Sequence, residues 1–342
     1  MNVVAVSIAA VAATAGVVAL TLQLPPVITV QRGYRGLAMD QVINPRDLPA
    51  QIALNAVPAV VDPVPPDGTP SSEVYENVQV LGDVDSAEFT RLMQAITEWV
   101  APEQGCAYCH ADGEDLSSDS LYTKVVARRM LQMTRHINTD WTAHVGATGV
   151  TCYTCHRGQP MPANTWSTNP GPPHAQGMAG NKAGQNMPAP VAGYASLPYD
   201  PFTPFFKEDN GIRVVSTSAL PEGNRHSIKQ TEWTYSLMMH MSESLGVNCT
   251  YCHNSRSFSA WDQSNPARAT AWHGIRMVRD VNNAYLEPLA ATLPHHRLGP
   301  LGDAPKSDCA TCHQGAFKPL YGASMLTDYP ELRGPVAPVA AP

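Results

Sequence analysis

Charged residues are scarce in this sequence, and their balance argues against nucleic acid as a partner. Lys, Arg, Asp and Glu make up 15% of its 342 residues, and the formal net charge is −7. Such a chain lacks the basic surface that binds phosphate backbones. Strand signals are also few and weak, and the 31 prolines are about 9% of the chain against a typical ~5%. We therefore expect a mainly α fold with much irregular chain.

No cysteine stands outside one repeated motif. The eight cysteines form four Cys-x-x-Cys-His segments: Cys106, Cys109 and His110; Cys152, Cys155 and His156; Cys249, Cys252 and His253; Cys309, Cys312 and His313. A disulfide framework does not need a histidine after each pair, and in a zinc knuckle the residue after the pair is free to vary. Four occurrences instead indicate c-type haem attachment, in which two thiols add across the haem vinyl groups and the adjacent imidazole is the proximal iron ligand. We expect four covalently bound c-type haems, attached outside the bacterial inner membrane.

The segment from Val3 to Leu22 carries no charge, and as a helix its twenty residues would span about 30 Å, one hydrocarbon core. A cleaved signal peptide ending near Ala13-Thr14-Ala15 is the alternative, but no Lys or Arg precedes the segment. We expect a retained transmembrane anchor over residues 1–24. Haem attachment requires the C-terminal side to be exported, so the N-terminus should be cytoplasmic although arginines follow the segment, at Arg32, Arg35 and Arg46.

The rest of the chain divides by composition and by an internal repeat. We expect an extended arm (25–80), a first two-haem half (81–160), a Pro/Gly-rich connecting segment (161–210), a second two-haem half (211–330) and a C-terminal tail (331–342). Apolar residues at helical spacing follow a capping pair, Asp85 and Glu88, and run through Phe89, Leu92, Met93, Ile96, Trp99 and Val100. A similar pattern lies around Trp233, Leu237, Met238 and Met241, and the halves share the pairs Arg129-Met130 and Arg276-Met277. The two halves should therefore be pseudo-symmetric.

Each predicted helix also carries methionine, which together with histidine is the usual sixth ligand of a low-spin haem. The candidates are Met93; Met130 or Met133; Met238, Met239 or Met241; and Met277. A lone methionine at helical spacing is more often packing than ligand, but a repeat before all four segments favours ligation. His144 lies only eight residues before Cys152 and would have to serve a different haem.

These features resemble the tetrahaem cytochrome c subunit of the purple-bacterial-type photosynthetic reaction centre. The resemblance extends from about residue 30 onward and rests on the four paired segments and on three short motifs: Gly33-Tyr34-Arg35-Gly36, Gly274-Ile275-Arg276-Met277-Val278-Arg279-Asp280, and the tail from Gly322-Ala323-Ser324 to Asp328-Tyr329-Pro330. The family's usual N-terminus is a lipidated cysteine behind a cleaved signal, which an apolar segment replaces here.

The resemblance implies a ligand set. Met93, Met130 and Met238 match the family's three methionine ligands, and His144 matches its histidine ligand, which reaches across to the haem beside His313. The internal repeat disagrees on this last haem and would choose Met277. Arg268 resembles a family arginine that raises the potential of the third haem, or it is a surface arginine.

By the same resemblance the protein would be an electron carrier and not an enzyme. It would dock on the L and M subunits of the reaction centre (and H if present) at the periplasmic face of the photosynthetic membrane and re-reduce the photo-oxidised special pair, with the third haem nearest. A soluble cytochrome, high-potential iron–sulfur protein or copper protein would supply electrons at the first haem. The main alternative is a membrane-anchored tetrahaem quinol dehydrogenase that feeds a periplasmic reductase; its haems are mainly bis-His and its chain is shorter.

Overall fold

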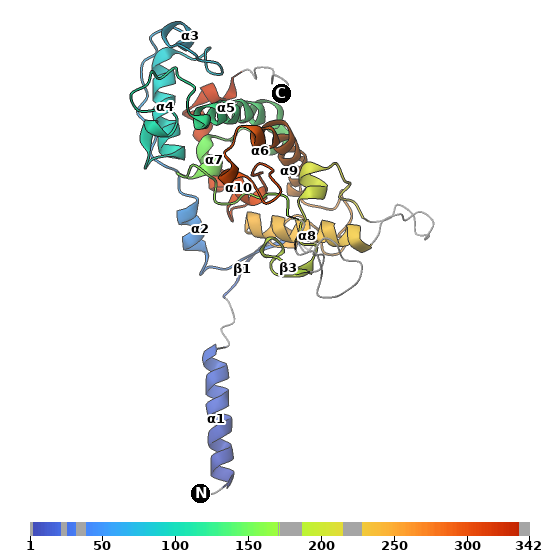
Figure 1. The fold of residues 1–342 in the computed structure, drawn as a ribbon. Coiled ribbons are helices and arrows are strands. Elements are labelled where there is room, and N and C mark those ends of the chain that lie inside the picture. The colour runs from blue at the N-terminus through green and yellow to red at the C-terminus, as the bar shows by residue number, and fades with distance from the viewer. Residues whose placement is uncertain are drawn as a thin grey trace, which may run out of the picture.

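A computed structural model describes residues 3–21, 26–31, 39–169, 171, 187–214 and 228–334 of the chain. Within these ranges the fold is mainly helical, with long irregular stretches and two small antiparallel ladders (Figure 1). This confirms the predicted mainly α fold with much irregular chain and the predicted N-terminal apolar helix. The motif Gly33-Tyr34-Arg35-Gly36, residues 170 and 172–186 of the connecting segment and residues 335–342 of the tail lie outside the described residues.

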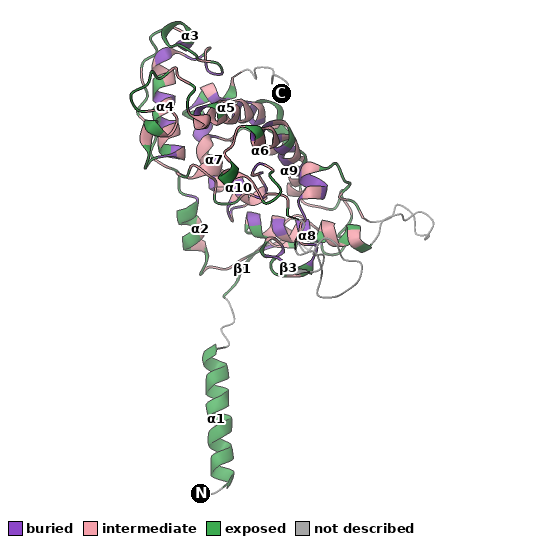
Figure 2. Cartoon of the chain, viewed as in Figure 1, coloured by how far each residue is buried: buried purple, intermediate pink, exposed green. Residues whose placement is uncertain are grey.

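Helix α1 (Val3–Thr21) stands apart from the body, and every one of its residues is exposed (Figures 1 and 2). By length and composition it is the one helix among the described residues that could cross a membrane, with a mean hydropathy of 2.5. Its hydroxyls Ser7, Thr14 and Thr21 each donate to the carbonyl four residues earlier. No hydroxyl of this helix therefore needs water as an acceptor, which suits an apolar surrounding.

Four long helices form the body: α4 (Ser86–Val100), α5 (Tyr122–Asp140), α8 (Ile228–Leu245) and α9 (Ala267–Val281). They coincide with the four methionine-bearing patterns of the sequence. Helix α4 begins as predicted, because the Asp85 carboxylate accepts from the amides of Ala87 and Glu88 at 3.0 and 3.5 Å. The Glu88 side chain pairs with Arg91 at 3.5 Å.

Shorter elements connect these helices. The strands are β1 (Ile28–Gln31) with β2 (Asp40–Ile43), and β3 (Met187–Pro188) with β4 (Ser196–Leu197). The short α-helices are α2 (Leu48–Leu54), α3 (Ser71–Val74), α6 (Thr142–Val145), α7 (Cys152–His156) and α10 (Cys309–His313). The 3₁₀ and π turns span Gly105–Tyr108, Pro190–Ala192, Thr203–Lys207, Cys249–Tyr251, Asn282–Leu286, Glu287–Ala291, His295–Arg297, Pro319–Gly322, Met325–Thr327 and Pro330–Arg333.

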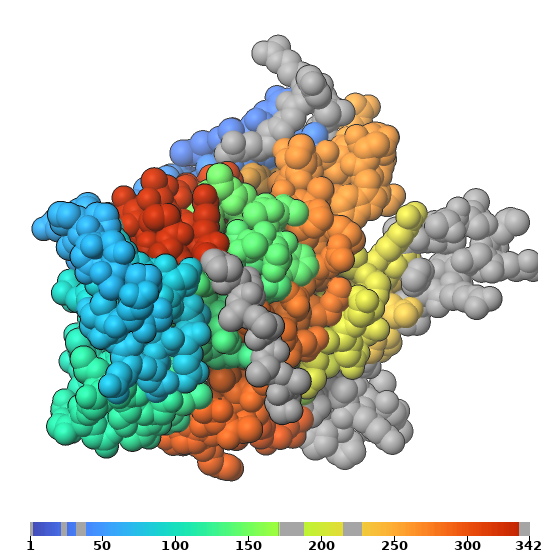
Figure 3. All heavy atoms as spheres, turned by 90° about the horizontal axis from the view of Figure 1, so that it is seen from above, coloured from blue at the N-terminus to red at the C-terminus, as the bar shows by residue number. Residues whose placement is uncertain are grey.

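Two apolar clusters fill the body. The first gathers α4 and the C-terminal turns, with Trp99 packed edge-on against Tyr329 at a ring separation of 4.6 Å. Figure 3 shows this C-terminal segment in red beside the blue and green N-terminal part of the body. The second cluster gathers α8, α9 and the aromatic residues Phe202, Phe205 and Phe206. The chain thus wraps back on itself, and residues far apart in sequence share each core.

Candidate functional site

The four Cys-x-x-Cys-His segments all fold as short helical turns. The first (Cys106–His110) and third (Cys249–His253) open in 3₁₀ turns, whereas the second (Cys152–His156) and fourth (Cys309–His313) are the α-helices α7 and α10. One turn of helix brings the two cysteines and the histidine of each segment to one side of the backbone.

The histidines of the four segments share one hydrogen-bond geometry. In each, ring atom Nδ1 lies 2.9 Å from a carbonyl oxygen a few residues later, and the pairs are His110 with Leu116, His156 with Gln159, His253 with Phe258, and His313 with Ala316. A carbonyl only accepts, so Nδ1 carries the proton and donates. The Nε2 lone pair of each neutral ring is left to bind a metal, as in metal sites whose histidine is oriented by a second hydrogen bond.

Burial keeps three of these four rings in the neutral form that binds metal. Burial lowers the pKa of His156 and of His253, and it lowers the pKa of His313 to about 4. Near neutral pH these imidazoles are therefore uncharged. Among the described residues no three His, Cys, Asp or Glu side chains converge to hold a metal ion by themselves, so each segment offers one imidazole and not a zinc-type ligand set.

The second and fourth segments have nearly the same local hydrogen bonds and backbone conformation. The amides of Thr151 and Asp308 each donate to the threonine hydroxyl three residues later at 2.9 Å. The residue after each histidine, Arg157 or Gln314, is left-handed, with φ of 52° and 46°. Arg157 then donates to the Cys312 carbonyl at 3.2 Å, and Gln314 donates to the Cys155 carbonyl at 3.3 Å. The two segments are thus clasped by a reciprocal pair of hydrogen bonds.

A residue of the N-terminal arm completes this clasp. Asn55 is only 3% exposed. Its amide nitrogen donates to the Gln314 carbonyl at 3.2 Å, and its amide oxygen accepts from Arg157 and from the Leu320 amide, both at 3.3 Å. A single buried side chain therefore ties the arm to both segments.

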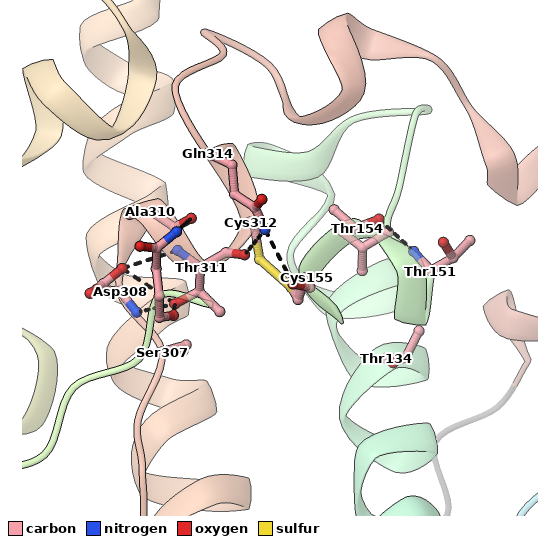
Figure 4. The surroundings of a disulfide bond; sticks show 12 residues. Thr134, Thr151, Thr154, Cys155, Ser307, Asp308, Ala310, Thr311, Cys312 and Gln314 are labelled. Carbon is pink, nitrogen blue, oxygen red and sulfur yellow. Dashed lines mark hydrogen bonds between the residues drawn. A yellow bond between two sulfur atoms is a disulfide. The ribbon is translucent and has the colours of Figure 1, made fainter. Parts of the chain in front are cut away.

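The structure joins Cys155 to Cys312 by a disulfide, while the other six cysteines are free (Figure 4). The Cα atoms of Cys155 and Cys312 are 4.4 Å apart, within the range that a disulfide accepts. The sequence did not predict this pairing of the second cysteines of two segments.

His144, on α6, faces the fourth segment. Its ring centre lies 6.2 Å from that of His313, and its Nδ1 donates to the Thr270 carbonyl at 2.9 Å, so its Nε2 is free as well. Burial lowers the pKa of His144. Two imidazoles on opposite sides of one metal ion, each with its nitrogen about 2 Å from the metal, have ring centres about 6 Å apart.

Gly274 on α9 makes room for this histidine. A Cβ at this position would lie 2.6 Å from the His144 ring carbon Cε1 and 2.9 Å from Nδ1. Met277, the rival ligand from the internal repeat, is 8% exposed inside the second apolar cluster.

The remaining candidate ligands are placed as the helical patterns predicted. Met93 lies on α4 and packs against the first cluster, Met130 lies on α5, and Met238 lies on α8 against the second cluster; all three are partly buried. Their ligation stays a prediction.

Arg268 lies at the start of α9 beside the third segment. Its Nη1 donates to the Ala260 carbonyl at 2.9 Å and to the Ser264 hydroxyl at 2.8 Å, and its guanidinium lies 4.1 Å from the ring centre of Trp261. Burial raises the pKa of the Cys252 thiol to about 11, and the Arg268 charge opposes that rise. Its charge therefore reaches the third segment.

Comparison with known proteins decides the family. A model described as photosynthetic reaction centre cytochrome C subunit matches residues 23–333 of the chain. The chain belongs to the photosynthetic reaction centre cytochrome c subunit family. Three relatives carry the same description. The one from Rubrivivax gelatinosus is 54% identical over 339 residues, 99% of this chain and 92% of that relative. The one from Thermochromatium tepidum is 50% identical over 94% of this chain and 79% of that relative. The one from Roseobacter denitrificans is 45% identical over 79% of this chain and 75% of that relative.

Membership in this cytochrome c family confirms the resemblance drawn from the motifs, and the geometry fits covalent haem. Each segment offers two cysteines and an imidazole with a free Nε2, although the disulfide occupies one cysteine of each of two segments. Sequence reasoning missed the clasp residues Asn55, Arg157 and Gln314, because no local pattern marks a bond between residues more than a hundred positions apart.

Proposed function

We propose that this chain carries four c-type haems and donates electrons to the photo-oxidised special pair of a photosynthetic reaction centre. One observation supports this proposal most directly. In a member of this family, each of the four segment histidines donates from Nδ1 to a backbone carbonyl and keeps its Nε2 available to bind iron. When bound, each haem supplies a one-electron iron couple. The chain supplies ligands, spacing and burial, so we assign it electron transfer and no bond-making catalysis. The comparisons do not favour a quinol dehydrogenase.

We assign the cysteines of the four segments, with Cys155 and Cys312 in their reduced form, to thioether links and the four segment histidines to the proximal positions. Met93, Met130 and Met238 are the proposed distal ligands of the first three haems. For the fourth haem we propose His144 and not Met277. The ring separation of 6.2 Å from His313 supports the first choice, and the burial of Met277 among apolar side chains argues against the second.

The third segment should lie nearest the membrane and the special pair. The Thr250 hydroxyl donates to the Asp40 carbonyl at 2.7 Å, and the Asn248 side chain accepts from the Val42 amide at 3.0 Å, so β2 is bound to this segment. Strand β2 pairs with β1, which begins seven residues after α1 ends. A seven-residue step spans at most about 25 Å. We propose that α1 crosses the membrane with its N-terminus in the cytoplasm, and that the haem body is periplasmic.

In the proposed pathway, electrons enter at the first haem, which is held by the Cys106–His110 segment. A soluble cytochrome, iron–sulfur or copper protein would reduce the first haem, and the L and M subunits would receive electrons from the third.

We also propose that the body consists of two pseudo-symmetric two-haem halves. Two likenesses support this: the second and fourth segments have matched caps, and the first and third share a 3₁₀ form.

A redox titration of the haem α-bands in isolated membranes, combined with flash excitation, tests the proposal. We expect three high-potential haems and one low-potential haem, with fast cytochrome oxidation after the flash, because Met ligation raises the potential and a second imidazole lowers it. Four low-potential haems that quinol reduces, with no response to light, would establish the quinol dehydrogenase instead.

Arg268 offers a quantitative test of the third site. A nearby positive charge disfavours ferric iron, so Arg268→Leu should lower the potential of the third haem. For a separation of about 10 Å and an effective dielectric constant of ~20, a unit charge would shift the potential of a haem held by this segment by about 70 mV. Arg268→Lys is the matched control and should keep most of the potential. Equal potentials in the Leu variant and the wild type would assign Arg268 to the surface.

A further inference from the structure

We propose that Asp308 lowers the potential of the fourth haem relative to that of the second, through a buried negative charge at a position where the second segment has a neutral residue. The inference rests on the proposed function, in which both segments carry haem. In this role Asp308 acts on the iron by its charge and not as a ligand.

The second and fourth segments offer a matched frame for this comparison. Thr151 and Asp308 each precede the first cysteine of their segment, and both are extended, with φ of −122° and −130°. Each donates its amide to the threonine hydroxyl three residues later, Thr154 or Thr311, at 2.9 Å. Figure 4 shows both caps. The two haem-binding turns therefore begin in nearly the same way.

The two capping residues differ in charge. Thr151 is 3% exposed, and its neutral hydroxyl donates to the Met325 sulfur at 3.6 Å. Asp308 is 6% exposed, and its carboxylate accepts from the Thr311 amide at 3.0 Å. The fourth segment thus holds a buried carboxylate where the second segment holds a hydroxyl.

The basic side chains near Asp308 have other partners or stand off from it. Lys306, two residues earlier, is fully buried, but its ammonium pairs with Asp303 and, at 3.3 Å, with Glu287. His240 Nε2 lies 3.8 Å from Asp308 Oδ1, which is beyond hydrogen-bond distance. The negative charge of Asp308 is therefore left to act on the segment that follows it.

The effect of this charge is already visible at the neighbouring thiol. Burial raises the pKa of the first cysteine of both segments, to about 12 for Cys152, and the Asp308 charge adds to the rise at Cys309. The same charge stabilises ferric iron held by the fourth segment, because ferric iron carries one more positive charge than ferrous iron. A carboxylate at this position should therefore lower the haem potential.

Arg157, the charged residue of the clasp, does not distinguish the two segments. Its guanidinium donates to the Thr154 carbonyl of the second segment at 3.1 Å and to the Cys312 carbonyl of the fourth at 3.2 Å. A positive charge in contact with both segments should raise both potentials. We therefore assign the difference between the segments to Asp308.

The first experiment is a potentiometric titration of the haem α-bands in the full-length, haem-bearing protein with Asp308→Asn. Asparagine keeps a side-chain oxygen that caps a helix, but it removes the charge. For a separation of about 10 Å and an effective dielectric constant of ~20, the ferrous-to-ferric ratio of the fourth haem at a fixed ambient potential should rise roughly 15-fold, or about 70 mV for a one-electron couple. The other three steps should stay as in the wild type.

The reciprocal experiment places the charge in the second segment. Thr151→Asp should lower the potential of the second haem by a similar factor, because aspartate caps the same turn in the fourth segment. Thr151→Asn is the matched control, since it changes the side chain without adding charge, and it should leave all four potentials unchanged.

Haem occupancy by peptide mass and low-spin absorption spectra establish that each variant keeps its haems and their ligands. In a fully occupied, low-spin Asp308→Asn protein, an unchanged low-potential step would overturn the proposal, and so would an equal shift of all four haems. If Asp308→Asn does not retain its fourth haem, Thr151→Asp decides: a second haem that keeps its potential contradicts the role of the charge. The same step moving in both variants would also contradict it.

The two levels can fail separately. If the wild-type protein from a competent host carries haem at fewer than four segments, the proposed function fails. If it carries four haems that include a low-potential one, and Asp308→Asn does not move that haem, only the role of Asp308 fails.

Discussion

A His144→Met variant is expected to lose the low-potential step of the haem titration. His144 faces His313 with its Nε2 free, so we assign the pair to the fourth haem. A thioether in place of an imidazole favours ferrous iron, and axial ligands span about 0.8 V in all, so we expect a rise on the order of 0.1–0.3 V. The measurement is a potentiometric titration of the α-bands, with the other three haems as internal references.

Met277→Leu is the matched control for this prediction. Met277 is buried in the second cluster, and a change to Leu nearly conserves its volume, so the four potentials should stay as in the wild type. Four high-potential haems in the wild type, with His144→Met without effect and one haem made high-spin in Met277→Leu, would reverse the assignment and favour the ligand of the internal repeat.

Gly274→Val should also disturb the fourth haem, although Gly274 carries no ligand. A Cβ would lie 2.6 Å from the His144 ring, and a β-branched side chain adds further atoms there. Helix α9 is buried on this face, so the ring has to move and its bond to the iron is lost or weakened. We expect the low-potential haem to become partly high-spin, detected by absorption and electron paramagnetic resonance spectroscopy.

Ala269→Val, on the exposed side of the same helix, controls for the lower helix propensity of valine. It should leave all four haem spectra unchanged. Normal low-spin spectra in Gly274→Val would mean that the helix yields to the ring and that Gly274 does not position His144. Spectral change in both variants would mean that α9 itself is sensitive and that the effect is not specific to the ring contact.

Much of the molecule could be predicted from local patterns. Asp85 caps α4 as expected, because capping depends on residues two or three positions away. The four long helices follow apolar spacing, and the Cys-x-x-Cys-His segments need only one helical turn each. Such features are set by neighbouring residues, so the sequence displays them directly.

The features that position the site were not predictable in the same way. The sequence contains Gly274 and His144, but their contact depends on how α6 docks on α9. Arg157 and Gln314 are non-glycine residues held in the left-handed region by surrounding contacts, and no propensity marks them. The approach of Cys155 to Cys312 spans 157 residues. Each depends on long-range packing, which periodicity does not encode.

The Asn55 clasp also sets an order of events during export. Its last partner, the Leu320 amide, lies 265 residues further along the chain, and in the proposed topology the exported part would cross the membrane beginning next to α1. At a synthesis rate of ~5–20 residues per second, that interval lasts on the order of 10–50 s. The Asp85 cap of α4 depends only on nearby residues and can form within this time, whereas the packing of Trp99 on Tyr329 and the clasp both close only afterwards. In the proposed topology the C-terminal turns would therefore complete the first apolar cluster and the junction between the halves in the same last step.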